Sequence, residues 1–222
     1  TSIDQSVDTC TNSFITMNSL ATNSNTSLSE GNLVLQSSYG SDNTSSYGTI
    51  GVNQGKWYWE IKYTTGTLAT SARVAGVIHV DSFTFVNGER ASTSGTAGIA
   101  LLQDGSTENS GTTTSAGSYM SALSTGDIIG IALDCDNGQV KFNKNGGTFG
   151  SDLTFATNDN GYYSAIDMRT SSGTSKVEVN FGNGYFGTTA VTSAGANASG
   201  NGIFEYDVPT GYTALSTKGL DS

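Results

Sequence analysis

The chain has 222 residues, of which 35% are hydrophobic and 13% are charged, and its formal net charge is −10. Such an acidic surface repels nucleic acid and anionic membranes at long range, and no apolar run approaches the ~20 residues that a transmembrane helix needs. We therefore expect neither nucleic-acid binding nor membrane insertion. The low charge does not indicate disorder, because the sequence contains 10 Tyr, 9 Phe and 2 Trp and can turn on its 29 glycines.

Residues 1–30 are rich in Ser, Thr and Asn, and we interpret them as an N-terminal arm on a domain that spans residues 31–222. Nine segments with strand character follow the arm, and Gly, Asn or Asp clusters separate nearly all of them. These segments are 32–36, 46–52, 56–63, 73–80, 97–102, 127–135, 138–144, 162–168 and 175–181. Their spacing, without helical periodicity, predicts an all-β fold in the form of an antiparallel sandwich or barrel.

The strand that begins near residue 56 carries a run of bulky side chains. Trp57 and Trp59 fall on one of its faces, and Tyr58 and Glu60 fall on the other. Two aromatic rings on one face suit either the packing between two sheets or a platform on which a sugar stacks. We favour packing, because a pair of aromatic residues on a strand is usually buried in the core.

The run from Asp134 to Gly138 contains two carboxylates, which suggests either a calcium loop or a hairpin turn. A helix–loop–helix calcium site needs oxygen ligands at loop positions 1, 3 and 5, a glycine at position 6 and a glutamate at position 12. Counted from Asp134, these last three positions hold Gly138, Gln139 and Asn145, so the template fails. A two-residue turn at Asn137-Gly138, with φ above zero at both residues, fits better. We predict no bound metal and no cofactor.

Two cysteines and one histidine limit the covalent chemistry that the chain can perform. Cys135 lies in a strand-like run and is interpreted as a buried free thiol, with a bridge to Cys10 as the alternative. His79 also lies in a strand-like run, where a structural role is favoured over a general base. Without His79 no Ser–His–Asp or Cys–His pair can form, so we expect a protein that is not an enzyme.

Three segments resemble the SPRY domain family when they are taken in order. "GKWYWEI" at 55–61 resembles an early strand of the family, and "GDIIGIALDCDNGQVKFNKNG" at 126–146 resembles its central hairpin. "VEVNFGNGYF" at 177–186, followed by "FEYDVPTGYTAL", resembles its ending. The resemblance implies a bent two-sheet sandwich of the concanavalin-like, lectin-like kind. It also implies a binding module without shared catalytic residues, which meets peptides or proteins through its loops.

The segment 12–36 resembles the lead-in of SPRY-type virion proteins of marine bacteriophages, with Ser19 in place of a proline. The arm also contains apolar side chains that need a partner, among them Phe14 and Leu20. Two arrangements remain open for it. The arm either packs on a neighbouring subunit, which would join copies into a homo-oligomer, or docks on its own domain as an edge strand.

Binding is expected in the polar loops, where an arginine near aromatic residues is a suitable anchor for a partner. The candidate residues are Phe83, Phe85 and Arg90 in 81–90, Tyr119 and Met120 in 115–121, and Arg169 in 167–176. The alternative is that these arginines pair with nearby carboxylates.

We therefore expect a non-enzymatic structural or binding protein of a virion surface, either a capsid decoration protein or a tail-fibre component. Its expected partners are other virion proteins or identical subunits, with a host-surface protein or glycan as a further partner. The alternative is a secreted, extracellular adhesin that binds carbohydrate or protein. A glycan-cleaving enzyme on the same kind of sandwich is the third hypothesis.

Overall fold

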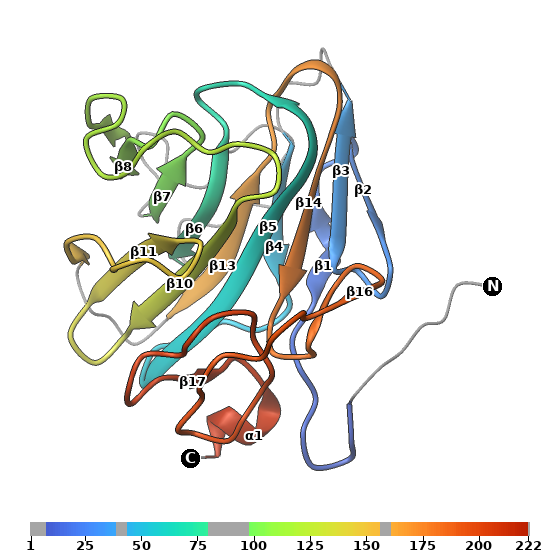
Figure 1. Ribbon diagram of the computed structural model, residues 1–222, viewed down its shortest axis with the longest axis vertical. Coiled ribbons are helices and arrows are strands. Elements are labelled where there is room, and N and C mark those ends of the chain that lie inside the picture. Colours follow the sequence, from blue (N-terminus) through green and yellow to red (C-terminus); the bar gives the residue numbers. More distant parts are fainter. Residues whose placement is uncertain (1–7, 39–43, 80–97, 156–160, 222) are drawn as a thin grey trace.

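Two large β-sheets pack face to face in the computed structural model, which describes residues 8–38, 44–79, 98–155 and 161–221 (Figure 1). Within these residues the first sheet has the strand order β1-β4-β13-β6-β7-β8-β9. Its strands are β1 Met17–Thr22, β4 Ser45–Gly48, β13 Tyr162–Asp167, β6 Arg73–His79, β7 Gly98–Leu102, β8 Thr107–Asn109 and β9 Thr112–Thr113.

The second sheet has the order β12-β11-β10-β5-β14-β3-β2, and β17 pairs in parallel with β5. Its strands are β12 Leu153–Thr154, β11 Gln139–Lys144, β10 Ile128–Asp134, β5 Lys56–Leu68, β14 Thr170–Asn180, β3 Val34–Ser38, β2 Thr26–Ser29 and β17 Thr213–Ala214. A small hairpin, β15 Tyr185–Phe186 with β16 Thr189–Ala190, and the short helix α1 Thr217–Leu220 complete the elements described.

The two sheets confirm the predicted all-β sandwich, and each of the nine predicted segments overlaps a strand. The strands that the sequence analysis missed are short or lie in the predicted arm. Among the described residues, no helix is long and apolar enough to span a membrane.

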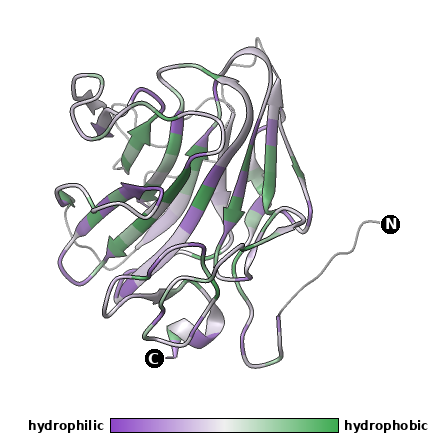
Figure 2. Ribbon diagram, in the orientation of Figure 1, coloured by the Kyte–Doolittle hydropathy of each residue, from purple (hydrophilic) through white to green (hydrophobic). Residues whose placement is uncertain are grey.

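The core between the sheets follows the alternation of the sequence. Trp57 and Trp59 on β5 are 3% and 0% exposed and lie in the main apolar cluster, so the packing interpretation is confirmed. On the neighbouring hairpin, Ile131 of β10 lies opposite Phe142 of β11, and both belong to the same cluster. Burying a large apolar side chain contributes roughly 1.5–3 kcal/mol. Figure 2 shows hydrophobic residues concentrated on the strands, whereas the turns are mostly of intermediate or low hydropathy.

The turn between β10 and β11 differs from the prediction. Asp134 pairs with Gln139, so the loop has four residues, 135–138, and only Gly138, at φ 63°, has a positive φ within it. The side chain of Asp134 explains the difference, because its carboxylate accepts hydrogen bonds from the backbone N–H and the side-chain amide of Asn137. This Asp-closed turn replaces the predicted two-residue turn.

The described part of the predicted arm lies on its own domain. Strands β1 and β2 form an edge of the first and the second sheet, respectively, and Ile15 and Met17 belong to the core. Phe14 forms a bridge with Ser216 near the C-terminal end of the chain. Of the two arrangements left open, docking as edge strands is therefore the one that these residues adopt, and contact with a neighbouring subunit stays a prediction.

The two cysteines are not bridged. Cys10 is exposed and Cys135 is buried, and both are free thiols. Burial, helped by the neighbouring carboxylates of Asp136 and Asp134, raises the pKa of Cys135 to about 12. The buried-thiol interpretation of Cys135 is confirmed, and the alternative of a Cys10–Cys135 bridge is wrong.

Replacing Gly138 by valine tests the turn. A β-branched side chain resists a positive φ, so we expect Gly138→Val to lower the free energy of unfolding by about 1–3 kcal/mol in urea titrations. Gly138→Asn is the matched control and should lose less, because asparagine tolerates this backbone region. Equal stability of Gly138→Val and the wild type would contradict the positive φ at this position.

Candidate functional site

Three of the six predicted binding residues, Phe83, Phe85 and Arg90, lie outside the described residues. The other three lie on two separate segments. Arg169 sits where the chain crosses from β13 to β14, and its carbonyl accepts a hydrogen bond from Ala69. No hydrogen bond or ion pair joins Arg169 to Tyr119 or Met120 within the described part of the chain.

Tyr119 and Met120 turn inward and hold their loop against the sandwich. The Tyr119 hydroxyl donates to the carbonyl of Ser151 at 2.9 Å and accepts from the N–H of Phe142 at 3.1 Å. Met120 packs against the main apolar cluster. Burial raises the pKa of Tyr119 above its usual value. Both side chains therefore have a structural role, and their contact with a partner stays a prediction.

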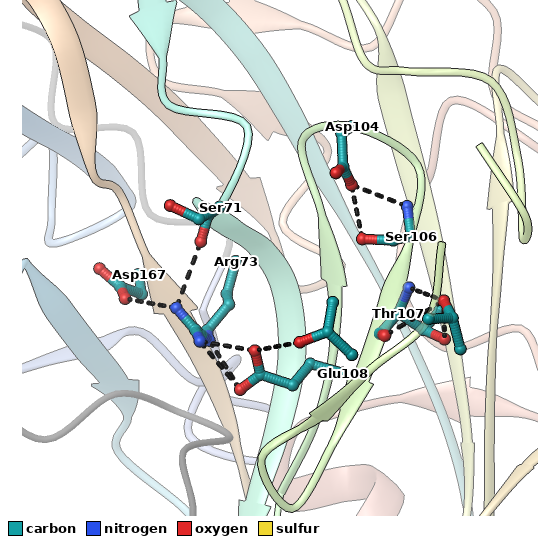
Figure 3. A network of polar contacts seen from close by, with 9 residues as sticks. Ser71, Arg73, Asp104, Ser106, Thr107, Glu108 and Asp167 are labelled. Carbon is teal, nitrogen blue, oxygen red and sulfur yellow. Dashed lines mark hydrogen bonds and ion pairs between the residues drawn. The ribbon is translucent and has the colours of Figure 1, made fainter. Parts of the chain in front are cut away.

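A buried ion network fixes the strand that leads into this loop (Figure 3). The guanidinium of Arg73 on β6 is 2.6 Å from the Glu108 carboxylate on β8 and 3.5 Å from the Asp167 carboxylate on β13. The Thr113 hydroxyl on β9 donates to Glu108 as well. Charged side chains this deep need partners, because an unpaired buried charge is strongly destabilising. The sequence analysis did not identify this network.

The two carboxylates of the β10–β11 turn are bound by protein groups. Asp134 is 2.8 Å from the ammonium of Lys56, and Asp136 accepts a hydrogen bond from the N–H of Gly55 at 2.7 Å. Burial alone would raise the pKa of Asp134, but the hydrogen bonds from Lys56 and Asn137 outweigh it and hold the pKa below its usual value. Within the described ranges, no group of three His, Cys, Asp or Glu side chains is placed to hold a metal ion.

A groove of about 710 Å³ opens beside this turn. It is lined by residues 51–57, by Asp136, and by parts of the segments 198–201, 211–213 and 218–220. The last three segments belong to residues 198–220, which we call the C-terminal cover, because its apolar side chains pack on Tyr58 and Ala132 on the outer face of the second sheet. The groove therefore lies between the start of β5, the β10–β11 turn and the C-terminal cover.

Trp57 forms the floor of the groove. Its indole N–H donates to the carbonyl of Gln54 at 2.8 Å, which fixes the ring. A Cβ atom at Gly219 of α1 would lie only 2.8 Å from this ring, so a glycine is needed for the helix to approach so closely. Lys56 and Lys218 bring positive charge to the lining, and Asp136 brings negative charge.

A buried carboxylate anchors the C-terminal cover to the sheet. Glu60 is 0% exposed and accepts hydrogen bonds from the Tyr58 hydroxyl, the Asn180 side-chain amide and the backbone N–H groups of Glu205 and Tyr206. The bonds from the cover are both 2.9 Å long. Burial raises the pKa of Glu60 to about 7, although the hydrogen bonds from Glu205, Tyr206 and Tyr58 oppose the shift.

A second polar centre ties the cover to the N-terminal part of the chain. The side chain of Asn201, which lines the groove, accepts a hydrogen bond from Asn12 and donates to the hydroxyl groups of Thr213 and Ser216, all at 3.0 Å. The groove wall at Asn201 is therefore held by buried and partly buried hydrogen bonds. A site on such a wall is largely formed before a ligand binds.

Comparison with protein families gives a single answer. The model of the SPRY domain matches residues 56–184, which is more than half of the chain. The chain belongs to the SPRY family. SPRY domains are generally non-catalytic modules that bind proteins. The C-terminal cover of this SPRY chain lies beyond the matched residues.

Several solved structures share the SPRY fold of this chain. Stonustoxin matches with a TM-score of 0.54 and 15% identity over 75% of this chain, which spans only 27% of the stonustoxin chain. The SPRY domain of human HERC1 has a TM-score of 0.50 and 16% identity over 78% of this chain and 95% of that domain. The PSpry domain of TRIM65 has a TM-score of 0.53 and 15% identity over 75% of this chain and 92% of that domain. No curated protein matches by sequence, and identities this low establish the fold alone.

The stability of this SPRY domain should depend on pH through Glu60. Its folded pKa is above its unfolded value, so its contribution is complete below about pH 4.5 and is lost as the pH rises through about 7. We expect the wild type to lose about 2–3 kcal/mol relative to Glu60→Gln between pH 5 and 8, measured by urea unfolding. An unchanged difference between the two proteins over this pH range would mean that the four donors keep Glu60 ionised.

Chelation tests the interpretation of the β10–β11 turn. Because Lys56, Asn137 and Gly55 already bind the two carboxylates, the melting temperature should be the same with EDTA and with added calcium. A loss of several degrees on chelation, abolished by Asp136→Asn, would contradict this and restore the calcium-loop hypothesis.

Proposed function

We propose that this SPRY chain is a non-enzymatic structural and binding protein of a virion surface, and that the groove beside the β10–β11 turn receives a segment of a partner protein. The groove is the observation on which the proposal rests. Its lining combines backbone of glycine residues with the exposed amide of Gln54 and charges of both signs. Such groups suit an extended polypeptide, whose N–H and C=O groups need many donors and acceptors.

A protein segment fits the groove better than a sugar does. Sugars stack on aromatic faces, but Trp57 on the floor is 3% exposed and Tyr212 in the wall is 8% exposed. Neither ring offers a free face. This favours a protein partner over a glycan, and it counts against the carbohydrate-binding form of the adhesin alternative.

Three features of the sequence support a virion setting. The segment 12–36 resembles the lead-in of phage SPRY-type virion proteins, the chain has few charged residues, and it is rich in Ser, Thr, Asn and Gly. In this setting the partners are other virion proteins or further copies of the chain. The loop residues Tyr119, Met120 and Arg169 are candidate second contacts on the presented surface.

Two measurements on purified virus particles test the location. Mass spectrometry of gradient-purified particles should detect the chain, and immunogold labelling should place it on the particle surface. Recovery only from the particle-free medium would contradict the virion role and favour the extracellular adhesin.

A groove-filling substitution tests the site. Ala198 is exposed and lines the groove, so Ala198→Trp should fill the groove without disturbing the core. We expect Ala198→Trp to bind the particles with an affinity at least about tenfold lower than that of the wild type, measured by cosedimentation at a fixed particle concentration. Its melting temperature should be unchanged. Ala190→Trp is the matched control, at an exposed alanine of β16 away from the groove. Equal loss in both variants, or in neither, would contradict the groove as the binding site.

A further inference from the structure

The charged residues of the chain are unevenly distributed. About one residue in eight is charged over the whole sequence, but the stretch from residue 9 to residue 55 contains only Glu30 and Asp42. This stretch holds β1, β2, β3 and β4, and no residue within these four strands is charged. We call this part of the sandwich, β1 to β4, the neutral edge.

The neutral edge contains the terminal strand of each large sheet. Strand β1 ends the first sheet and β2 ends the second, and Figure 1 shows β1, β2 and β3 together on one side of the molecule. Natural proteins usually protect such edges with charged side chains, proline or bulges, because an open edge pairs with other chains. Charge and proline are absent from both β1 and β2.

Strand β2 is also regular. Its residues Thr26–Ser29 pair with Ser37–Val34 of β3 at four consecutive positions without a bulge. On its other side no strand lies among the described residues. In an antiparallel pair, alternate residues direct their N–H and C=O groups away from the partner strand, so β2 offers a short row of such groups. Two groups at its ends bond locally, the Thr26 N–H to Asn23 and the Ser29 C=O to Leu33.

A rigid apolar knob lies on the same edge. The register of β1 against β4 shifts between Met17 and Thr22, and Leu20 within this bulge is 86% exposed. Its N–H is bound by the side-chain oxygen of Asn18, whose carbonyl accepts from the Thr22 hydroxyl. The bulge is therefore held in shape while it presents a leucine side chain to solvent.

We propose that the neutral edge joins two copies of this chain. Strand β2 of one copy pairs antiparallel with β2 of the other about a two-fold axis, so that the second sheet continues across the dimer, and each Leu20 knob packs on the partner. A two-fold arrangement requires one patch that is complementary to itself, which an antiparallel pair of identical strands provides.

The charge distribution selects a second copy as the occupant. Two molecules with a net charge of −10 repel each other over most of their surfaces, and the neutral edge is where two copies meet with the least repulsion. A basic partner would be drawn to the acidic surface elsewhere. The proposal deepens the proposed virion role, in which copies of the chain assemble, and rests on it only for the biological setting.

Sedimentation equilibrium over a wide concentration range tests the dimer. The wild type should reach twice the chain mass of 22.9 kDa. The double variant Ser27→Lys with Leu20→Ser places two lysines close together across the two-fold axis and removes the knob, so its dissociation constant should rise at least about tenfold. Both positions are exposed, and the melting temperature of the monomer should therefore remain unchanged.

The matched control is Ser151→Lys with Ile203→Ser, which makes the same kinds of change at exposed positions. Ser151 lies just before β12, the strand at the opposite end of the second sheet from β2. This control should dimerise like the wild type. A wild type that is monomeric throughout, or an edge variant that dimerises as well as the control, would overturn the proposal. Either result would leave the groove proposal intact, since that is judged by the binding of Ala198→Trp to particles.

Discussion

The buried carboxylate of Glu60 is the constraint on which much of this structure depends. Strand β5 is the central strand of the second sheet, and both of its faces are shielded from water around Trp59, with Glu60 on the face away from the core. A buried carboxylate is tolerated only with hydrogen-bond donors around it. Two of these donors are backbone groups of the C-terminal cover, which must therefore return across the sheet. The groove exists because the cover follows this path past the β10–β11 turn.

Much of the sandwich could be predicted from residues that alternate along one strand. Apolar side chains recur at every second position of a strand, as Trp57 and Trp59 do on β5 and as the series around Ile131 does on β10. This recurrence identifies the face of the strand that turns toward the core. It does not identify what covers the opposite face. The two partners of Glu60 in the C-terminal cover lie about 145 residues further along the chain, and no local pattern connects them to it. The turn at 135–138 escaped prediction for a related reason, since a side chain, that of Asp134, closes it.

The candidate sites were harder to predict than the fold, because a loop residue can turn in either direction. Tyr119 was selected as a surface contact, yet its hydroxyl satisfies two backbone groups and its ring packs at 6.0 Å from that of Phe142. The groove could not be predicted, because it is assembled from five short segments that meet only in the folded chain. Most of their residues are small or polar, and no single segment indicates a groove.

The bonds between the two ends of the described chain have a consequence for how the protein is made. Ser13 and Thr217 exchange hydrogen bonds between residues 204 positions apart, and Phe14 pairs with Ser216. Contacts between such distant residues slow folding, because a long loop must close before they form. On the ribosome, the segment around Phe14 must wait until the residues near 217 have emerged. During that interval the apolar side chains around Phe14 stay open to chaperones and to other nascent chains.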